Sequence, residues 1–150
     1  LVGMTSCDDD EKMSCNLSGE WHGYFGSYYV TNDRHGDEHV FYADETYMRF
    51  TPDYPFATHG YGVEVDYYDR GPYEYKYFSF DWRVEDERLI LRYPHDRDMN
   101  VVIDDYRMNT NRFSGYIGED DFCLHRVDCE YDWNSYDCDY GYCRRSYWDW

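Results

Sequence analysis

Lysine, aliphatic side chains and long apolar runs are all scarce in this chain. Lys12 and Lys76 are the only lysines, and 32 Asp and Glu against 14 Lys and Arg give a formal charge of −18. A field of this sign repels nucleic-acid phosphates and anionic lipid headgroups, which excludes a nucleic-acid binder and a protein that adsorbs to membranes through basic residues. No run approaches the roughly 20 apolar residues of a spanning helix.

The sequence motifs of catalysis and cofactor binding are also missing. The chain has no Gly-x-Ser-x-Gly, no Gly-x-x-x-x-Gly-Lys and no His-Glu-x-x-His. Asp96 opens a stretch that resembles a calcium loop, but Val101 occupies the required glycine position, which excludes an EF-hand. We therefore predict no cofactor, no metal and no enzyme; a small hydrolase is the weakest alternative, because an acidic chain hides any carboxylate pair among many.

Aromatic residues are what the chain has in abundance. Leu, Ile, Val and Phe make up 25 of the 150 residues, a fraction that with this charge is typical of disorder. Yet the chain holds 20 Tyr, 5 Trp and 8 Phe, and disordered chains are poor in aromatics. We predict a folded domain whose core is built from rings.

The pattern from residue 18 to 128 predicts strands. Apolar and polar residues alternate, most clearly in 78–85, and turn residues recur at short intervals. The expected strands are 20–30, 40–51, 60–68, 78–85, 88–93, 100–106, 113–117 and 122–127. Short links make sequential strands antiparallel neighbours, so we predict an all-β, eight-stranded antiparallel meander closed as a barrel, with a two-sheet sandwich as the alternative.

The N-terminal residues resemble a lipid-attachment signal. Met4-Thr5-Ser6-Cys7 is similar to a bacterial lipobox, whose small residues fit the signal peptidase and whose cysteine takes the lipid. The acidic run 8–11 resembles the export signal of Bacteroidota lipoproteins, which implies display on the outer cell surface; in other Gram-negative bacteria an Asp at this position implies retention at the inner membrane. We predict lipid attachment at Cys7 and an outer-membrane location. The alternative is a frayed start with a free or bridged Cys7 and a solvated acidic tether.

Two motifs in the strand region resemble lipocalins. Ser18-Gly19-Glu20-Trp21 is similar to their Gly-x-Trp signature, and the segment 122–126, which ends in Arg126, resembles their last strand. With the lipobox, the chain looks like the small lipocalin-like lipoproteins of Bacteroidota. The resemblance implies a barrel in which Trp21 is buried at one end and Arg126 stacks on its ring, with Gly19, Trp21 and Arg126 as structural residues.

Cysteines gather at the C-terminal end. In an exported protein we expect disulfides among Cys123, Cys129, Cys138 and Cys143, in any of three connectivities, with Cys15 left over. The alternative is a metal site made by these four residues and His125, although the spacing matches no structural zinc module. Residues 129–150 hold eight Tyr and Trp but no Leu, Ile, Val or Met, so they form either a weakly ordered tail or a segment that lies against the barrel.

These segments give a three-part organisation and two functional hypotheses. We expect a signal remnant, lipid anchor and acidic tether in 1–17, a lipocalin-like barrel in 18–128, and a Tyr/Asp/Cys-rich tail in 129–150. The barrel holds a small amphipathic ligand, or it is filled and contacts a glycan or protein partner through exposed rings, for which Tyr73, Tyr75 and Tyr77 on one strand face are the candidates. The alternative for these tyrosines is a wet strand face without a ligand.

Overall fold

The protein is an all-β chain with one short helix. The computed structural model describes residues 9–96, 99–127, 133, 141–146 and 148. Within these residues the elements, in chain order, are α1 (Asp9–Leu17), β1 (Gly19–Tyr24), β2 (Tyr28–Asn32), β3 (Glu38–Tyr42), β4 (Glu45–Pro52), β5 (His59–Tyr67), β6 (Tyr73–Glu85), β7 (Arg88–Arg92), β8 (Val101–Ile103), β9 (Asp105–Met108), β10 (Arg112–Ile117), β11 (Asp120–Val127) and β12 (Tyr142–Arg144).

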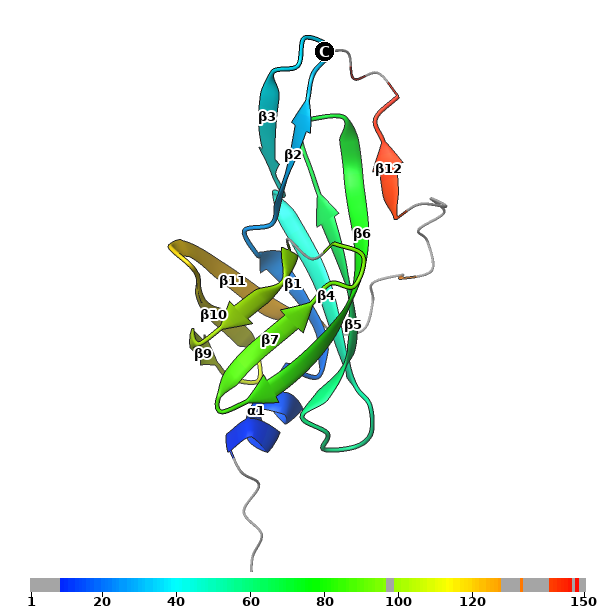
Figure 1. Ribbon diagram of the computed structural model, residues 1–150. Helices are drawn as coiled ribbons and strands as arrows, with labels where there is room; N and C mark the ends of the chain where they lie inside the picture. Colours follow the sequence, from blue (N-terminus) through cyan, green and yellow to red (C-terminus); the bar gives the residue numbers. More distant parts are fainter. Residues whose placement is uncertain (1–8, 97–98, 128–132, 134–140, 147, 149–150) are drawn as a thin grey trace, which may run out of the picture.

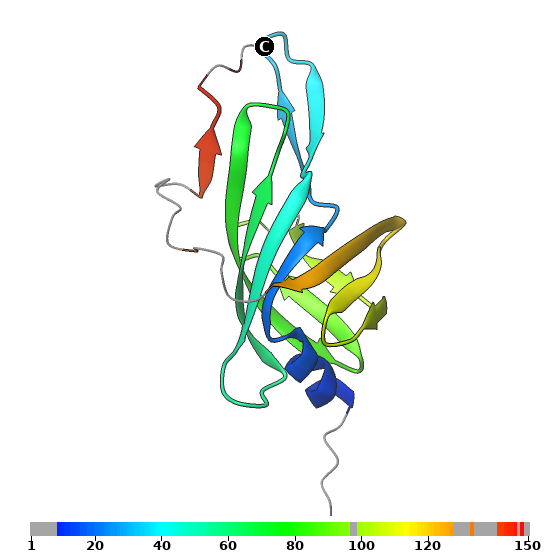
Figure 2. The same cartoon turned by 180° about the vertical axis from the view of Figure 1, so that it is seen from behind.

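Most of the strands form one nearly closed antiparallel barrel. Its order is β8-β7-β6-β5-β4-β1-β11-β10-β9, and β12 pairs with β6 outside this path. The first strand, β1, pairs with both β4 and the last barrel strand, β11, so the sheet curls round on itself (Figures 1 and 2). The predicted all-β barrel is therefore confirmed, and the two-sheet sandwich is set aside.

The two ends of the barrel sheet are consecutive in the chain. Only Asp104 separates β8 from β9; β8 pairs with β7, whereas β9 pairs with β10. The predicted strand 100–106 is thus a bent strand whose two halves pair with different neighbours. When β8 and β9 are counted as one strand, the described barrel has eight strands in meander order, as the sequence predicts.

The predicted strand 20–30 is wrong as a single strand. It divides at Gly26, whose φ of 80° lies in the left-handed region that glycine tolerates best. The predicted strand 40–51 divides as well, between β3 and β4. The pieces β2 and β3 pair with each other as a separate two-stranded sheet, which projects beyond one end of the barrel (Figure 1). The N–H of Ala43, just after β3, donates to the carbonyl of Ser27, just before β2, at 2.8 Å. This bond holds the two ends of the hairpin together where they join the barrel.

The acidic segment after Cys7 is a helix where the sequence analysis expects a tether. Asp9, Asp10 and Glu11 lie in the first turn of α1, where negative side chains favour the helix dipole. Met13 and Leu17 share one face, four residues apart, and are buried against the barrel core. The helix covers the end of the barrel opposite the hairpin (Figure 1). Among the described residues, no helix is long and apolar enough to cross a membrane.

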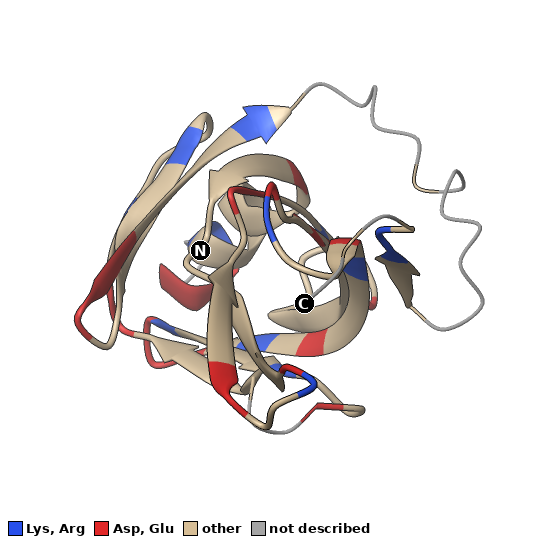
Figure 3. Ribbon diagram, turned by 90° about the horizontal axis from the view of Figure 1, so that it is seen from above, with Lys and Arg blue, Asp and Glu red and all other residues tan. Residues whose placement is uncertain are grey.

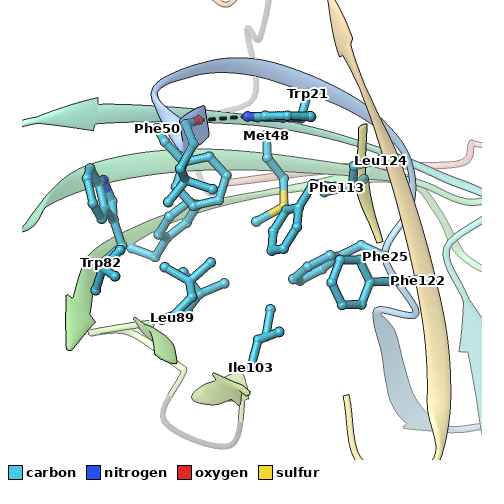
Figure 4. Packing of buried hydrophobic residues seen from close by; sticks show 14 of the residues in the cluster. Trp21, Phe25, Met48, Phe50, Trp82, Leu89, Ile103, Phe113, Phe122 and Leu124 are labelled. Atoms are coloured by element: carbon cyan, nitrogen blue, oxygen red, sulfur yellow. Dashed lines mark hydrogen bonds between the residues drawn. The ribbon is translucent and has the colours of Figure 1, made fainter. Parts of the chain in front are cut away.

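The barrel interior is filled by rings and large aliphatic side chains (Figure 4). The largest fully buried side chains are Trp21, Trp82, Tyr93, Phe50, Phe80, Phe113, Leu17, Met48, Leu89, Leu91, Ile103 and Leu124. Many of the rings meet edge to face, for example Phe50 with Phe80 at 5.3 Å and Phe113 with Phe122 at 4.9 Å between centroids. The prediction of a core made of rings is confirmed.

Candidate functional site

Trp21 and Arg126 lie together at the helix end of the barrel, as the resemblance to lipocalins predicts. The two residues are register partners on β1 and β11, and Trp21 is fully buried. The guanidinium carbon of Arg126 lies 4.4 Å from the centroid of the Trp21 ring. A contact of this kind stabilises by roughly 0.5 to 2 kcal/mol, depending on how dry it is.

The same pair fastens α1 to the barrel. The indole N–H of Trp21 donates to the carbonyl of Leu17 at 2.7 Å, and Arg126 Nη1 donates to the carbonyl of Ser18 at 2.8 Å. Other N–H groups of Arg126 donate to the carbonyls of Asn16 and Thr110. The bonds to Asn16, Leu17 and Ser18 satisfy acceptors at and just after the end of the helix, and the bond to Thr110 joins the β9–β10 loop. A Cβ at Gly19 would lie 2.6 Å from Arg126 Nη1, so glycine leaves room for the guanidinium.

Two carboxyl groups are fully buried at the hairpin end of the barrel. Glu64 and Asp66 are two residues apart on β5 and both have zero exposure. Glu64 accepts hydrogen bonds from the hydroxyls of Tyr93 at 2.5 Å and Ser27 at 3.2 Å. Asp66 Oδ1 accepts one from the hydroxyl of Thr46 at 2.7 Å. The Glu64–Asp66 pair is therefore surrounded by three hydroxyls: that of Thr46 on β4, that of Ser27 between β1 and β2, and that of Tyr93 just after β7.

Burial raises the pKa of both acids. For Asp66 the desolvation and the neighbouring Glu64 carboxyl raise the pKa well above the ordinary value of an aspartate. For Glu64 desolvation raises the pKa although the hydrogen bonds from Asp66, Tyr93 and Ser27 oppose it. Two carboxylates this close cannot both be charged without a large cost, which favours a state in which the pair shares a proton.

Three further polar atoms near this pair have no hydrogen-bond partner among the described residues. They are Asp66 Oδ2 and the hydroxyls of Tyr29 and Tyr68. Burial raises the pKa of Tyr29 to about 12, and burial next to Asp66 and Glu64 raises that of Tyr68 further. The ammonium group of Lys76 lies over the rings of Tyr29 at 4.2 Å and Tyr73 at 4.7 Å.

Tyr73, Tyr75 and Tyr77, the candidates for exposed contact rings, are not fully exposed on β6. All three are half-buried. The ring of Tyr73 packs against Tyr29 and Tyr142, each at 5.2 Å between centroids. Strand β12 pairs with this half of β6, so Tyr75 is a register partner of Cys143. Period two predicts these tyrosines on one face, but no local pattern shows that Tyr29 of the hairpin and Tyr142 of β12 pack on Tyr73.

The described part of the C-terminal segment lies against the barrel. The indole N–H of Trp133 donates to Glu20 Oε1 at 2.9 Å, and Arg49 lies 5.5 Å from the Trp133 ring. Arg145 Nε donates to the carbonyl of Gly71 at 3.1 Å, and its backbone N–H donates to Pro72 at 2.7 Å. For these residues the second of the two predicted alternatives, a segment that lies on the barrel, holds.

Exposed aromatic residues lie on several elements, and on the β2–β3 hairpin two of them are paired with each other across the strands. Tyr28 and Tyr42 are cross-strand partners with 54% of each side chain exposed, and their ring centroids are 5.4 Å apart. Val30 and Val40 form the next pair on the same face, with 49% and 46% exposed. The opposite face of the hairpin packs Tyr29 and Phe41 against the barrel end. We call the four exposed residues the hairpin face.

An open acidic cleft of about 380 Å³ lies beside α1. It is lined by Asp9, Asp10, Asp86 and Glu87. Asp10 accepts hydrogen bonds from the backbone N–H groups of Asp86 at 3.0 Å and Glu87 at 2.7 Å, and so holds the β6–β7 turn to the helix. Among the described residues, no group of three or more His, Cys, Asp or Glu side chains is arranged to hold a metal ion.

Only some of the predictions about cysteines concern residues that the structure describes. Cys7, Cys129 and Cys138 lie outside the described residues, so lipid attachment and the expected bridges stay predictions. Between the three described cysteines, Cys15, Cys123 and Cys143, no disulfide forms. The thiol of Cys123 lies 3.7 Å from His125 Nε2 on the outer wall, and that of Cys143 lies 3.7 Å from Glu74.

Sequence reasoning missed both the acid pair and the hairpin face. Glu64 and Asp66 sit in a strand whose valines are equally buried, so alternation could not show that the acids point inward. The hairpin had a usable signal, because Tyr28, Val30, Val40 and Tyr42 lie symmetrically about the turn-rich segment 33–37.

The chain matches no family model, and comparisons with the curated proteins and with the solved structures give no significant match.

Proposed function

We propose that this protein is a non-catalytic cell-envelope lipoprotein whose filled barrel supports an outward binding surface, the hairpin face. The observation that carries the proposal is the contrast between inside and outside: rings fill the barrel core, whereas two tyrosines and two valines stand exposed on one face of a hairpin. Exposed apolar clusters with an ordered backbone are typical of interaction sites. Tyrosine suits such a site because it supplies contact area and a hydroxyl together.

Binding of the full chain to arrays of neutral glycans and of synthetic peptides tests this proposal. We expect binding that Tyr28→Ser combined with Tyr42→Ser abolishes. The matched control is Tyr61→Ser combined with Tyr116→Ser, which removes two equally exposed tyrosines from other strands without changing the net charge. If both double variants bind as the native chain does, the hairpin face is not the binding surface.

A second candidate function is the capture of a small polar ligand at the hairpin end of the barrel. The observation that favours it is the buried group of unpartnered polar atoms on Asp66, Tyr29 and Tyr68. Native mass spectrometry of the purified chain distinguishes the two functions. A retained small molecule that Asp66→Asn removes would support the ligand site, and the bare chain mass supports the filled barrel.

The lipid anchor at Cys7 is part of the proposal and has a separate test. Most of the acidic run that follows it lies in the first turn of α1, which is bonded to the barrel end through Arg126. An anchored Cys7 would therefore hold that end towards the membrane and the hairpin away from it (Figure 1). We expect the protein to partition into detergent in extracts of the organism that encodes it, and Cys7→Ser to move it to the aqueous phase.

A further inference from the structure

The hairpin face is held rigidly although it is exposed. The opposite face of the hairpin packs Tyr29 edge to face on Tyr68 at 4.7 Å and on Tyr73 at 5.2 Å. At the hinge, the carbonyl of Ser27 accepts the N–H of Ala43, and its hydroxyl donates to the buried Glu64. A partner therefore meets a preformed surface and does not have to order it, which lowers the entropic cost of binding.

The geometry of the hairpin suits an extended segment. In the sheet of β2 and β3 each strand pairs only with the other within the described residues, so each has an outer edge of backbone N–H and C=O groups. The exposed side chains follow the strand repeat: the Tyr28–Tyr42 pair, then Val30–Val40, then Asn32–Glu38. An added strand takes backbone hydrogen bonds from an edge, while its alternate side chains lie along such a row.

Carboxylates stand at both ends of this row. Glu38 is exposed at the tip end. At the other end, Tyr24 lies near Tyr42 and near the exposed Asp120 and Asp121; burial and these charges raise the pKa of Tyr24. Acidic residues also lie all around the molecule in the view down the barrel (Figure 3). With a net charge of −18, a second copy of this chain or an anionic polymer is repelled, and a cationic partner is attracted.

We propose that the hairpin face binds an extended polypeptide segment that carries lysine or arginine side chains. The cationic side chains lie over the Tyr28 and Tyr42 rings and reach Glu38, Asp120 and Asp121, and apolar side chains of the segment cover Val30 and Val40. This inference rests on the proposed function, because it names the partner class of the same surface.

The experiment measures binding of two synthetic peptides to the full chain by fluorescence anisotropy. One peptide has the repeat Lys-Ser-Val-Ser, so that lysine and valine alternate along one face of the extended segment, and the other has glutamate in place of lysine. We expect the lysine peptide alone to bind, and Tyr28→Ser combined with Tyr42→Ser to weaken it about tenfold or more. These substitutions leave the net charge unchanged, so non-specific attraction to an acidic protein is preserved. The control variant, Tyr61→Ser with Tyr116→Ser, should bind as the native chain does.

Four outcomes overturn the inference in distinguishable ways. If neither variant loses affinity, the peptide is held by general charge alone, and if the control variant loses as much affinity as the hairpin variant, binding is not specific to the hairpin face. If neutral glycans bind, the hairpin variant abolishes that binding, and the lysine peptide does not bind, the proposed function stands. The basic polypeptide is then the wrong partner class. If neither probe responds to the hairpin variant, both proposals fail.

Discussion

At the scale of single residues, Arg126 does more than cover an indole ring. Its guanidinium lies over Trp21 and donates to carbonyls of Asn16, Ser18 and Thr110, which belong to the end of α1, the following residue and the β9–β10 loop. A planar group with five N–H donors can serve these acceptors together, whereas an ammonium group cannot keep the same geometry.

We therefore predict that Arg126→Lys lowers the free energy of unfolding by about 1–3 kcal/mol although the charge is kept. Urea unfolding followed by tryptophan fluorescence measures the change. Arg88→Lys, at an exposed position of β7, is the control and should change stability by less than about 0.5 kcal/mol. Equal stability of the two variants would show that Arg126 acts through its charge alone.

The buried acids make stability depend on pH in an unusual direction. Because burial raises the pKa of both Glu64 and Asp66, the folded chain keeps a proton that the unfolded chain releases above its ordinary carboxyl pKa of about 4. The stability that this proton contributes is complete below that pKa and is lost as the pH rises towards the raised folded value.

Between about pH 4.5 and pH 7 the free energy of unfolding should fall less steeply in Asp66→Asn than in the native chain. This window begins just above the ordinary carboxyl pKa of about 4. The difference in slope is at most about 1.4 kcal/mol per pH unit, the value for one proton. Urea unfolding at several pH values measures it. Asp81→Asn, at an exposed position of β6, removes the same charge and serves as the control. Identical slopes for Asp66→Asn and the native chain would show that the pair titrates normally.

At the scale of elements, the β6–β7 turn joins its strands through two residues in the left-handed region. Asp86 and Glu87 have φ of 52° and 62°, the signs of a type I′ turn. Such turns match the twist of a hairpin but favour Asn-Gly, because a side chain at positive φ is strained.

Asp86→Asn combined with Glu87→Gly should therefore raise Tm by about 2–4 °C, since the backbone N–H bonds to Asp10 are kept. Thermal unfolding followed by circular dichroism provides the measurement. In the control, Glu119→Gly, glycine replaces an exposed turn residue outside the left-handed region, and Tm should fall. A drop in Tm for the Asn-Gly variant would contradict the strain argument.

Sequence patterns predicted strands correctly where one face of the strand is buried in the core and the other is exposed. The alternation of Phe80, Trp82 and Val84 along β6 fixes which face is buried, and the Trp21–Arg126 contact is the one that the resemblance to lipocalins implies. The break at Gly26 and the bend at Asp104 depend on how the closing sheet fits together, which no local pattern contains. The pairing of β12 beside Tyr75 is likewise long-range, because β12 comes from far along the chain.

At the scale of the whole molecule, the barrel combines a packed interior with a strongly acidic exterior. A packed core of rings stabilises the fold, while the net charge of −18 opposes the compact state through self-repulsion. The ion pairs among the described residues do little to offset this repulsion. In the Arg83–Glu85 pair, for example, the charged atoms are 3.4 Å apart and both side chains are exposed to solvent. The same charge opposes self-association and favours the cationic partner proposed for the hairpin face.

Added salt should consequently stabilise the protein. Raising NaCl from about 0.02 M to about 0.5 M shortens the Debye length from roughly 20 Å to about 4 Å, which screens repulsion across the molecule. We expect Tm to rise by about 4 °C or more, the shift that 1–2 kcal/mol gives in a domain of this size. Choline chloride at the same ionic strength should give the same rise, because screening does not depend on the cation. A Tm that falls with salt would mean that attractive ion pairs outweigh the repulsion, and a rise with NaCl alone would indicate bound sodium.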